Sequence, residues 1–167
     1  YKVDVLNDVE LLKVSGNLNS DDWTAIKNMK NLLGLDLSEA KFNSVPGYAF
    51  DGLSNLSYVV LPEGPTSIGQ YAFYKTQILN INIPNTVTSI GQFAFAGTRI
   101  RKVNFKEGSE LTFIGNNAFG GCTSLEQFIM PNTVMSLGTK NGNDNGACET
   151  FYNCANLEKL HFSDALL

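Results

Sequence analysis

The stretch "SIGQYAF" at residues 67–73 returns almost unchanged as "SIGQFAF" at residues 89–95. Related copies precede and follow this pair, as "VPGYAF" at 45–50 and "IGNNAF" at 114–119. The final phenylalanine of the pattern recurs about every 23 residues, a period within the range of leucine-rich repeats. A self-similar period of this size predicts a solenoid, in which each repeat forms one coil and stacks on the next.

A fifth copy is interrupted. Leu137-Gly138 resembles its first part and Thr150-Phe151 its last part, with an insertion between them. The insertion, "TKNGNDNGACET" at 139–150, spaces three asparagines like the ligands of a calcium loop, but Tyr152 stands where such a loop carries glutamate. We therefore interpret it as a surface turn that contributes to partner specificity, since insertions in repeats project from one face.

Short apolar-alternating runs lie between the copies and predict one strand per coil. In "NINIP", Ile81 and Ile83 face one way and Asn80 and Asn82 the other, as in a half-buried strand. The following proline has no N–H for a ladder and ends the strand. The predicted strands are Val9–Val14, Leu32–Leu37, Leu56–Leu61, Ile78–Ile83, Ile100–Phe105, Leu125–Met130 and Leu157–Phe162.

The repeated heptapeptide itself is predicted to be core. Gly91 allows the backbone to turn or to approach the neighbouring coil, and Ala94 leaves room for that approach. Stacked strands lie about 4.8 Å apart, and aromatic rings attract at centroid distances of about 4.5–7 Å. One ring per coil therefore predicts a continuous ladder of Phe50, Phe73, Phe95, Phe119 and Phe151.

The two ends differ from the middle. Residues Ser20–Lys30 predict a helix with Asn19 or Ser20 as N-cap, and Trp23, Ile26 and Met29 form its buried stripe. The last strand is followed by no polar cap, so we expect the chain to continue past Leu167 or to be covered there. The chain opens with Tyr1, which indicates that an export signal is not part of it.

Composition excludes some classes of function. The 167 residues are 43% hydrophobic and 17% charged, typical of a soluble globular domain, and no apolar run approaches a membrane span. The net charge of −4 argues against nucleic-acid binding. There is one histidine, and we find no nucleophile-elbow, phosphate-loop or dinucleotide-binding motif, so we predict no enzyme, catalytic residue or cofactor.

Three cysteines are too few for a disulfide scaffold. Cys122 and Cys154 occupy the same position in consecutive coils, so a disulfide and a pair of buried thiols are both open, with the thiols favoured. A zinc site of Cys148, Cys154 and His161 lacks a fourth ligand and a C-x-x-C pair, so we predict no metal site.

The outward positions of the predicted strands form the candidate binding surface. If the strands alternate as expected, two residues of each central coil face outward in two lanes. An exposed tyrosine with aliphatic neighbours suits a protein contact. The candidate binding residues are Tyr58, Val60, Asn80, Asn82, Lys102, Asn104, Gln127, Ile129, Lys159 and His161.

The stretches "LNINIPNTVTSIGQFAFAGT" and "LTFIGNNAFGGCTSLEQFIMP" closely resemble the BspA-like leucine-rich repeats of bacterial surface proteins. The resemblance runs from about Leu32 to Phe162, although Thr76 and Thr98 stand where the motif often has cysteine. It implies a single domain over residues 1–167, part of a longer exported chain. The fold expected is a right-handed leucine-rich-repeat superhelix with a parallel concave sheet, short helical turns on the convex side and an N-terminal helix.

The resemblance also implies a location outside the cell or on its surface and a host-matrix or bacterial surface protein as partner. We therefore expect a non-catalytic adhesion or interaction module that binds protein through the concave face. A carbohydrate-binding module is the first alternative, because Asn80, Asn82 and Asn104 offer amides near Tyr58. A structural spacer in a surface protein is the second.

Overall fold

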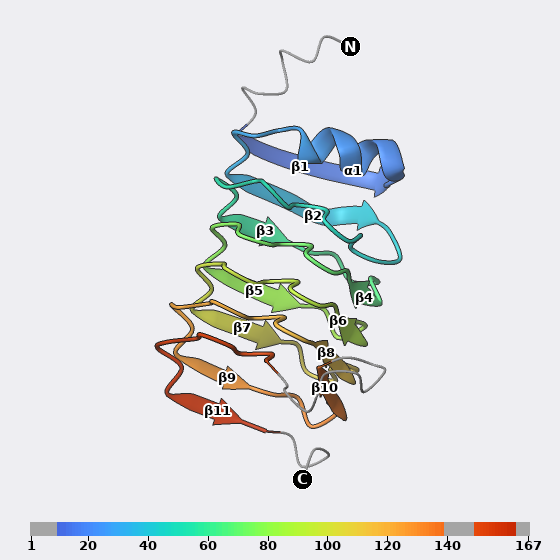
Figure 1. Ribbon diagram of the computed structural model, residues 1–167. Helices are drawn as coiled ribbons and strands as arrows, with labels where there is room; N and C mark the ends of the chain where they lie inside the picture. The colour runs from blue at the N-terminus through green and yellow to red at the C-terminus, as the bar shows by residue number, and fades with distance from the viewer. Residues whose placement is uncertain (1–9, 139–148, 163–167) are drawn as a thin grey trace.

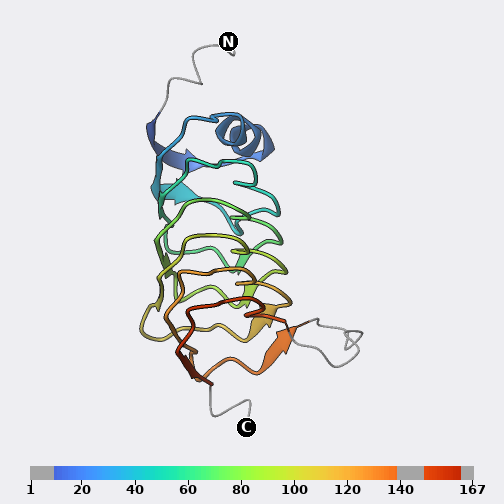
Figure 2. The same ribbon diagram turned by 60° about the vertical axis from the view of Figure 1, so that its left-hand side comes forward.

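The computed structural model describes residues 10–138 and 149–162. Over these residues the chain winds as a right-handed superhelix, with coils stacked in sequence order from the N-terminal to the C-terminal end (Figures 1 and 2). Every strand pairing in the described part of the chain is parallel. The expected solenoid is therefore confirmed.

Seven strands of the described residues, one per coil, line one side of the stack, and we call them the first sheet. Each begins two residues after the start of its apolar run, and the first two extend past the ends of their runs, to Asn17 and Lys41. The residues that open the five central runs are fully buried: Leu32, Leu56, Ile78, Ile100 and Leu125. The strands are β1 (Leu11–Asn17), β2 (Gly34–Lys41), β3 (Tyr58–Val60), β5 (Asn80–Ile83), β7 (Lys102–Phe105), β9 (Gln127–Ile129) and β11 (Lys159–His161).

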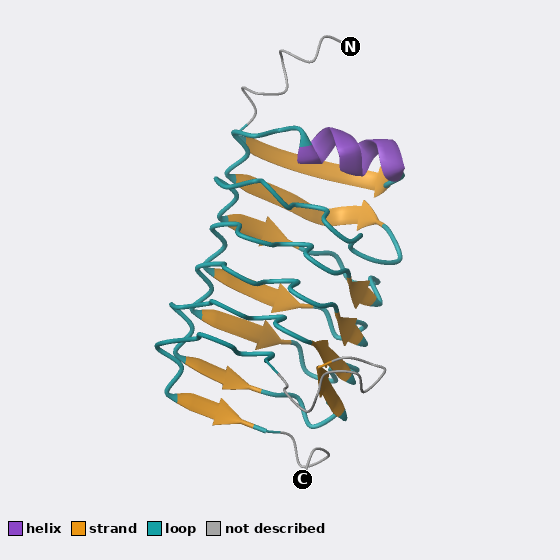
Figure 3. Cartoon of the chain, viewed as in Figure 1, coloured by secondary structure: helices purple, strands orange, loops and turns teal. Residues whose placement is uncertain are grey.

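A second, shorter sheet runs along the other side of the stack and was not predicted. Its strands are formed by the "SIG" segments and their equivalents, in which Ile68, Ile90 and Ile114 are buried and the residue before each is partly exposed. In spatial order they are β10 (Ser136–Gly138), β8 (Phe113–Gly115), β6 (Ser89–Ile90) and β4 (Ser67–Ile68) (Figure 3). The interrupted fifth copy belongs to this pattern, because Leu137 pairs with Ile114 and Thr150 accepts a hydrogen bond from the Phe119 N–H at 2.9 Å.

The glycine of each "SIG" segment is required by close contact between coils. A Cβ on Gly91 would lie 2.6 Å from the Gln70 backbone nitrogen, and one on Gly69 only 2.4 Å from the nitrogen of Gly47. Neither glycine has a positive φ. Of the two roles open to Gly91, close approach is therefore the one that the structure uses.

The phenylalanines stack in the centre of the coils. Phe73 and Phe95 lie 5.0 Å apart with planes 8° from parallel, and Phe95 and Phe119 lie 5.2 Å apart at 7°. Phe50 and Phe151 extend the ladder at centroid distances of 4.8 Å and 5.7 Å from their neighbours. The first four rings are fully buried, and Phe151 is half-buried.

The turn that carries each phenylalanine makes a further set of bonds between coils. The N–H groups of Tyr71, Phe73 and Lys75 donate to the carbonyls of Gln92, Ala94 and Ala96 at 2.7–3.0 Å. Tyr71 and Lys75 have φ of 55° and 56°, so alternate residues turn their N–H groups toward the same neighbouring coil. The short helical turns expected here are single turns, closed by bonds such as Ala72 N–H to Gly69 C=O at 3.3 Å.

The N-terminal helix, α1 (Ser20–Lys27), is three residues shorter than predicted, and Asn28 is its C-cap. Asn19 is its N-cap and accepts hydrogen bonds from the Asp21 and Asp22 N–H groups at 2.7 Å and 3.2 Å. Trp23 packs edge-on against Phe50 at 5.8 Å and so closes the first end of the phenylalanine ladder. Ile26 and Met29 are buried, as the helical spacing predicted.

Candidate binding face

Strand register places the predicted outward residues in two lanes on the first sheet. Tyr58 lies beside Gly34 and Val60 beside Asp36. Further along, the paired positions are Asn80 with Lys102, Asn82 with Asn104, Gln127 with Lys159, and Ile129 with His161. Tyr58 and Ile129 are the large apolar residues of these lanes in the central coils, with exposed fractions of 61% and 63%.

The hydrogen-bonded ladder of the first sheet is interrupted twice. Pairing joins β1, β2 and β3, then β5 and β7, then β9 and β11, and no ladder is formed between β3 and β5 or between β7 and β9 within the described residues. The strand after each interruption, β5 or β9, is followed closely by proline, Pro84 or Pro131. At the same position after β7 stands Lys106, whose N–H donates to the Ile83 carbonyl at 3.3 Å. Proline cannot make this bond. The missing bond does not by itself break a ladder, because Pro62 holds the same position after β3, which pairs with β2.

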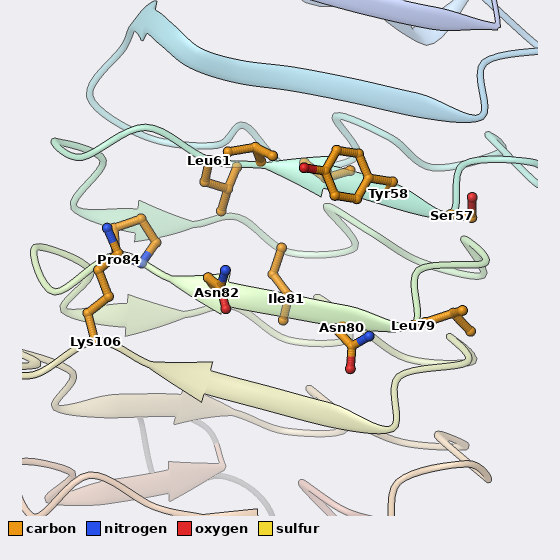
Figure 4. A pocket seen from close by; sticks show the side chains of 11 residues that line it. Ser57, Tyr58, Leu61, Leu79, Asn80, Ile81, Asn82, Pro84 and Lys106 are labelled. Atoms are coloured by element: carbon orange, nitrogen blue, oxygen red, sulfur yellow. The ribbon is translucent and has the colours of Figure 1, made fainter.

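A groove lies at each interruption. The first groove, of about 460 Å³, lies between β3 and β5, where Tyr58 and Leu61 face Asn80, Asn82 and Pro84 (Figure 4). Its lining is Ser57, Tyr58, Val59, Val60, Leu61, Leu79, Asn80, Ile81, Asn82, Pro84 and Lys106.

The second groove, of about 400 Å³, lies between β7 and β9. Phe105 and Ile129 supply apolar surface, and Lys102 and Asn104 supply polar groups. Its lining is Lys102, Val103, Asn104, Phe105, Lys106, Gly108, Ser109, Ile129, Met130 and Pro131. Seven of the ten predicted binding residues line one groove or the other, whereas Gln127, Lys159 and His161 line neither.

Lys106 is a groove residue that the alternation pattern does not identify, because it lies beyond the last outward position of its strand. It lines both grooves and forms an ion pair with Glu63. The sequence distinguishes Lys106 in one way, because the corresponding positions of neighbouring coils hold Pro62, Pro84 and Pro131. Leu79, with an exposed fraction of 41%, was missed because alternation in the predicted strand Ile78–Ile83 puts it on the inward side with Ile81 and Ile83, whereas β5 begins only at Asn80.

Polar contacts order parts of the face. Asn104 donates from Nδ2 to Asn82 Oδ1 at 2.9 Å, so the two amides form a pair between β5 and β7.

Near the N-terminal end, the hydrogen bond from Lys13 to Glu39 raises the pKa of Lys13. Hydrogen bonds from the Ser38 side chain and backbone lower the pKa of Asp36. Lys13–Glu39 and Lys106–Glu63 are the ion pairs among the described residues, so Lys102 is an unpaired cation there.

The cysteine positions form a column of buried donors. Cys122 and Cys154 are free thiols, as favoured, and each donates from Sγ to a carbonyl of the preceding coil: Phe95 at 3.1 Å and Phe119 at 3.0 Å. At the equivalent position, Thr76 donates instead within its own coil, to the Phe73 carbonyl at 2.9 Å. Threonine therefore substitutes for cysteine as a small side chain with one proton to donate.

Metal binding finds no support in the described residues, where no three histidine, cysteine or acidic side chains are placed to hold an ion. Cys148, one member of the zinc set considered above, lies outside those residues, as does most of the 139–150 insertion. Near the C-terminal end of the insertion, Glu149 is bound by Asn117, which donates from Nδ2 to Glu149 Oε2 at 2.9 Å.

A first prediction concerns Cys122. Burial raises the pKa of its thiol from 9.0 to about 12. Between pH 9 and 12 the unfolded chain loses this proton while the folded chain keeps it, so the thiol makes stability fall as pH rises through that window. Cys122→Thr, which copies Thr76 and Thr98, should fold normally and show a smaller loss of stability over this pH range in urea titrations. Equal pH dependence in the two proteins would contradict the assignment.

Comparison with known proteins identifies the family of the chain. Residues 43–166 match six copies of the BspA-type leucine-rich repeat region. The chain belongs to the BspA-type leucine-rich repeat family. Among curated proteins, none matches it.

Solved structures of similar fold include a leucine-rich repeat protein from Bacteroides ovatus, with a TM-score of 0.53 and 17% identity, covering 93% of this chain and 46% of that one. A leucine-rich repeat protein from T. pallidum is similar at a TM-score of 0.45 and 19% identity, over 91% of this chain and 69% of that one. This BspA-type chain thus spans less than half of the Bacteroides ovatus chain, and at these identities the likeness shows the fold alone. The helix in the described residues is too short to cross a membrane.

Proposed function

We propose that this BspA-type chain is one leucine-rich-repeat domain of an exported surface protein, and that it binds another protein without catalysis through the outward face of the first sheet. The observation that carries the proposal is the first groove, where Tyr58 stands 61% exposed beside aliphatic and amide side chains. Exposed aromatic residues beside a pocket are typical of energetically dominant contacts in protein interfaces. Parallel solenoids commonly use such extended faces for binding.

The side chains that line the two grooves support a binding role over a catalytic one. Catalysis by acid and base groups needs titratable side chains that converge in a cleft. The ionisable side chains lining the two grooves are Lys102, Lys106 and Tyr58, and no carboxylate or histidine lines either. Family and fold agree, since leucine-rich repeats generally serve as interaction modules.

A binding screen tests the proposal. The purified chain is immobilised and exposed to extracellular-matrix proteins and to extracts of bacterial surface proteins, and any retained protein is titrated against Tyr58→Ala. Loss of this anchor should weaken binding at least about 30-fold, the equivalent of about 2 kcal/mol. Tyr152→Ala is the matched control, because Tyr152 is 64% exposed but lies in a turn away from the face. Equal losses in both variants, or no retained protein at high micromolar concentration, would refute the proposal.

Carbohydrate binding is a second candidate, favoured by one observation. Asn80 and Asn82 line the first groove together with Tyr58, and Asn82 is paired with Asn104 on the next strand. Amides with an aromatic ring can bind sugar hydroxyl groups and a sugar face. A glycan array with the wild-type chain and Tyr58→Ala separates the candidates: glycan binding that depends on Tyr58, without protein binding, supports the second. Binding to neither class would leave a structural spacer.

A further inference from the structure

The residue immediately before each strand of the first sheet is exposed, and these residues follow one another along the stack (Figure 1). Backbone hydrogen bonds join neighbours on both sides of the first groove: the Leu33 N–H donates to the Glu10 carbonyl at 2.7 Å, and the Arg101 N–H donates to the Leu79 carbonyl at 2.8 Å. We call these residues the leading row. From β1 to β11 it consists of Glu10, Leu33, Ser57, Leu79, Arg101, Glu126 and Glu158.

The N-terminal half of the face carries an exposed apolar patch. Leu33 and Leu79 of the leading row are both 41% exposed. Beside them, the side chains of Leu11 and Tyr58 meet over Gly34, because a Cβ on Gly34 would lie 2.7 Å from Leu11 Cδ2 and 3.6 Å from Tyr58 Cδ1. Leu11 is 77% exposed. Apolar side chains gathered on one exposed surface are typical of a contact with another molecule.

Charged residues of opposite sign flank this patch. Glu10 precedes it in the leading row, and Arg101 follows it, beside Lys102 on β7. None of the three forms an ion pair among the described residues. The first five positions of the row are therefore acidic, apolar, polar, apolar and basic. This order is complementary to its own reverse, as a two-fold symmetric contact between identical chains requires.

The order of the side chains selects the position of the two-fold axis. An axis parallel to β3, with the two stacks antiparallel, places Ser57 against Ser57 of the second copy. The leucines of the row then face one another, and Glu10 of each copy faces Arg101 of the other. Tyr58, next to Ser57, also lies on this axis, so that its ring is used by both copies. Opposite charges and apolar side chains are both matched in this arrangement.

Other positions of the axis along the row are less favourable. An axis midway between β3 and β5 places Glu10 against Glu126, and an axis along β5 places it against Glu158, so that like charges meet. An axis midway between β7 and β9 pairs Arg101 with Glu126, but it leaves most of the apolar patch uncovered. The axis along β3 is therefore the one that the row favours.

The match depends on the order of the residues and does not need equal spacing on the two sides of the axis. The strands β1, β2 and β3 are paired with one another, whereas no ladder joins β3 and β5 within the described residues. Glutamate and arginine have long side chains, and Lys102 provides a second cation beside Arg101. In the row of Tyr58, the aliphatic part of Lys102 faces Leu11 of the other copy.

We propose that the protein bound by this face is a second copy of the chain, docked antiparallel about a two-fold axis along β3. The two apolar patches cover each other at the centre, and Glu10 of each copy pairs with Arg101 of the other at both ends. The proposal rests on the proposed function and names the partner for the same face.

Sedimentation velocity of the purified chain measures the association, and charge reversal tests the pairing. Glu10→Arg and Arg101→Glu each place like charges opposite one another at both ends of the contact, so each variant alone should dimerise at least about tenfold more weakly than the wild type. An equimolar mixture of the two variants should dimerise as strongly as the wild type, because both opposite-charge pairs are restored. The double variant should do so for the same reason.

Three further variants locate the contact. Tyr58→Ala should weaken the dimer at least about tenfold, because the ring is lost from both copies at the axis. Glu126→Arg should leave it unchanged, whereas an axis between β7 and β9 would make this variant weaken it. Tyr152→Ala, which changes an exposed ring away from the face, should also have no effect.

Several results would overturn the inference. They are a chain that stays monomeric at high micromolar concentration, a dimer that both charge reversals leave unchanged, and a mixture of the two reversals that stays monomeric. If the chain is monomeric while the binding screen retains another protein in a Tyr58-dependent manner, the inference fails and the proposed function stands. If neither association is found, both fail. If the dimer forms as expected, the immobilised chain also retains the soluble chain, which is then the retained protein of the screen.

Discussion

Phe95→Ala is expected to lower the free energy of unfolding by about 3–5 kcal/mol. The Phe95 ring is fully buried and lies between two parallel rings, with centroids 5.0 Å and 5.2 Å away. Truncation removes its burial and both ring contacts, and it leaves a cavity that the neighbouring coils cannot fill without breaking their hydrogen bonds. Most small domains are stable by about 5–15 kcal/mol, so the variant should be near its limit of stability.

Urea denaturation followed by circular dichroism measures this loss. Phe162→Ala is the control, because Phe162 is 50% exposed and lies outside the ladder, and it should cost less than about 0.5 kcal/mol. A loss below about 1 kcal/mol for Phe95→Ala would mean that the ladder contributes little to holding the coils together.

Gly91→Ala should be almost as damaging, although it adds only one methyl group. The new Cβ would lie 2.6 Å from the Gln70 nitrogen, 2.8 Å from the Gly69 carbonyl carbon and 3.0 Å from the Gln70 Cα. These are backbone atoms, so no side chain can rotate away and the two coils must separate. We expect a loss of about 3 kcal/mol, at the upper end of ordinary overpacking.

Gly108→Ala distinguishes this contact from a general intolerance of glycine replacement. Nothing lies within 4 Å of a Cβ at Gly108, but its φ is +73°, so its replacement should cost only the conformational penalty of about 1–2 kcal/mol. Thermal and urea unfolding of the two variants gives the comparison. If Gly91→Ala were the milder of the two, close contact between coils would not be the reason for that glycine.

Much of this architecture can be predicted from the repeat period and from the alternation within each strand. Phe95 and its equivalents recur at one position, and Ile81 and Ile83 alternate with Asn80 and Asn82, so core and surface follow from spacing alone. Four of the outward residues of the first groove were identified in this way. Their role in binding stays a prediction.

The second sheet and the left-handed backbone positions could not be predicted from sequence spacing, because they depend on contacts between coils. The second sheet was missed because its strands are two or three residues long, too short for alternation to be recognised. The left-handed backbone of Tyr71 and Lys75 was missed because neither is a residue type that favours it, and bonding to the next coil compensates for its cost.

The sequence by itself determined that similar coils stack, which side chains fill them and which two residues of each coil face outward. It did so because the period of a repeat and the alternation of a strand are local properties of the chain. Only the tertiary structure decided where neighbouring strands lose their pairing, and therefore where the two grooves form. That outcome depends on backbone contacts between neighbouring coils, such as the bond from the Lys106 N–H to the Ile83 carbonyl beside the β5–β7 pair, and the repeat pattern of the sequence does not reveal these contacts.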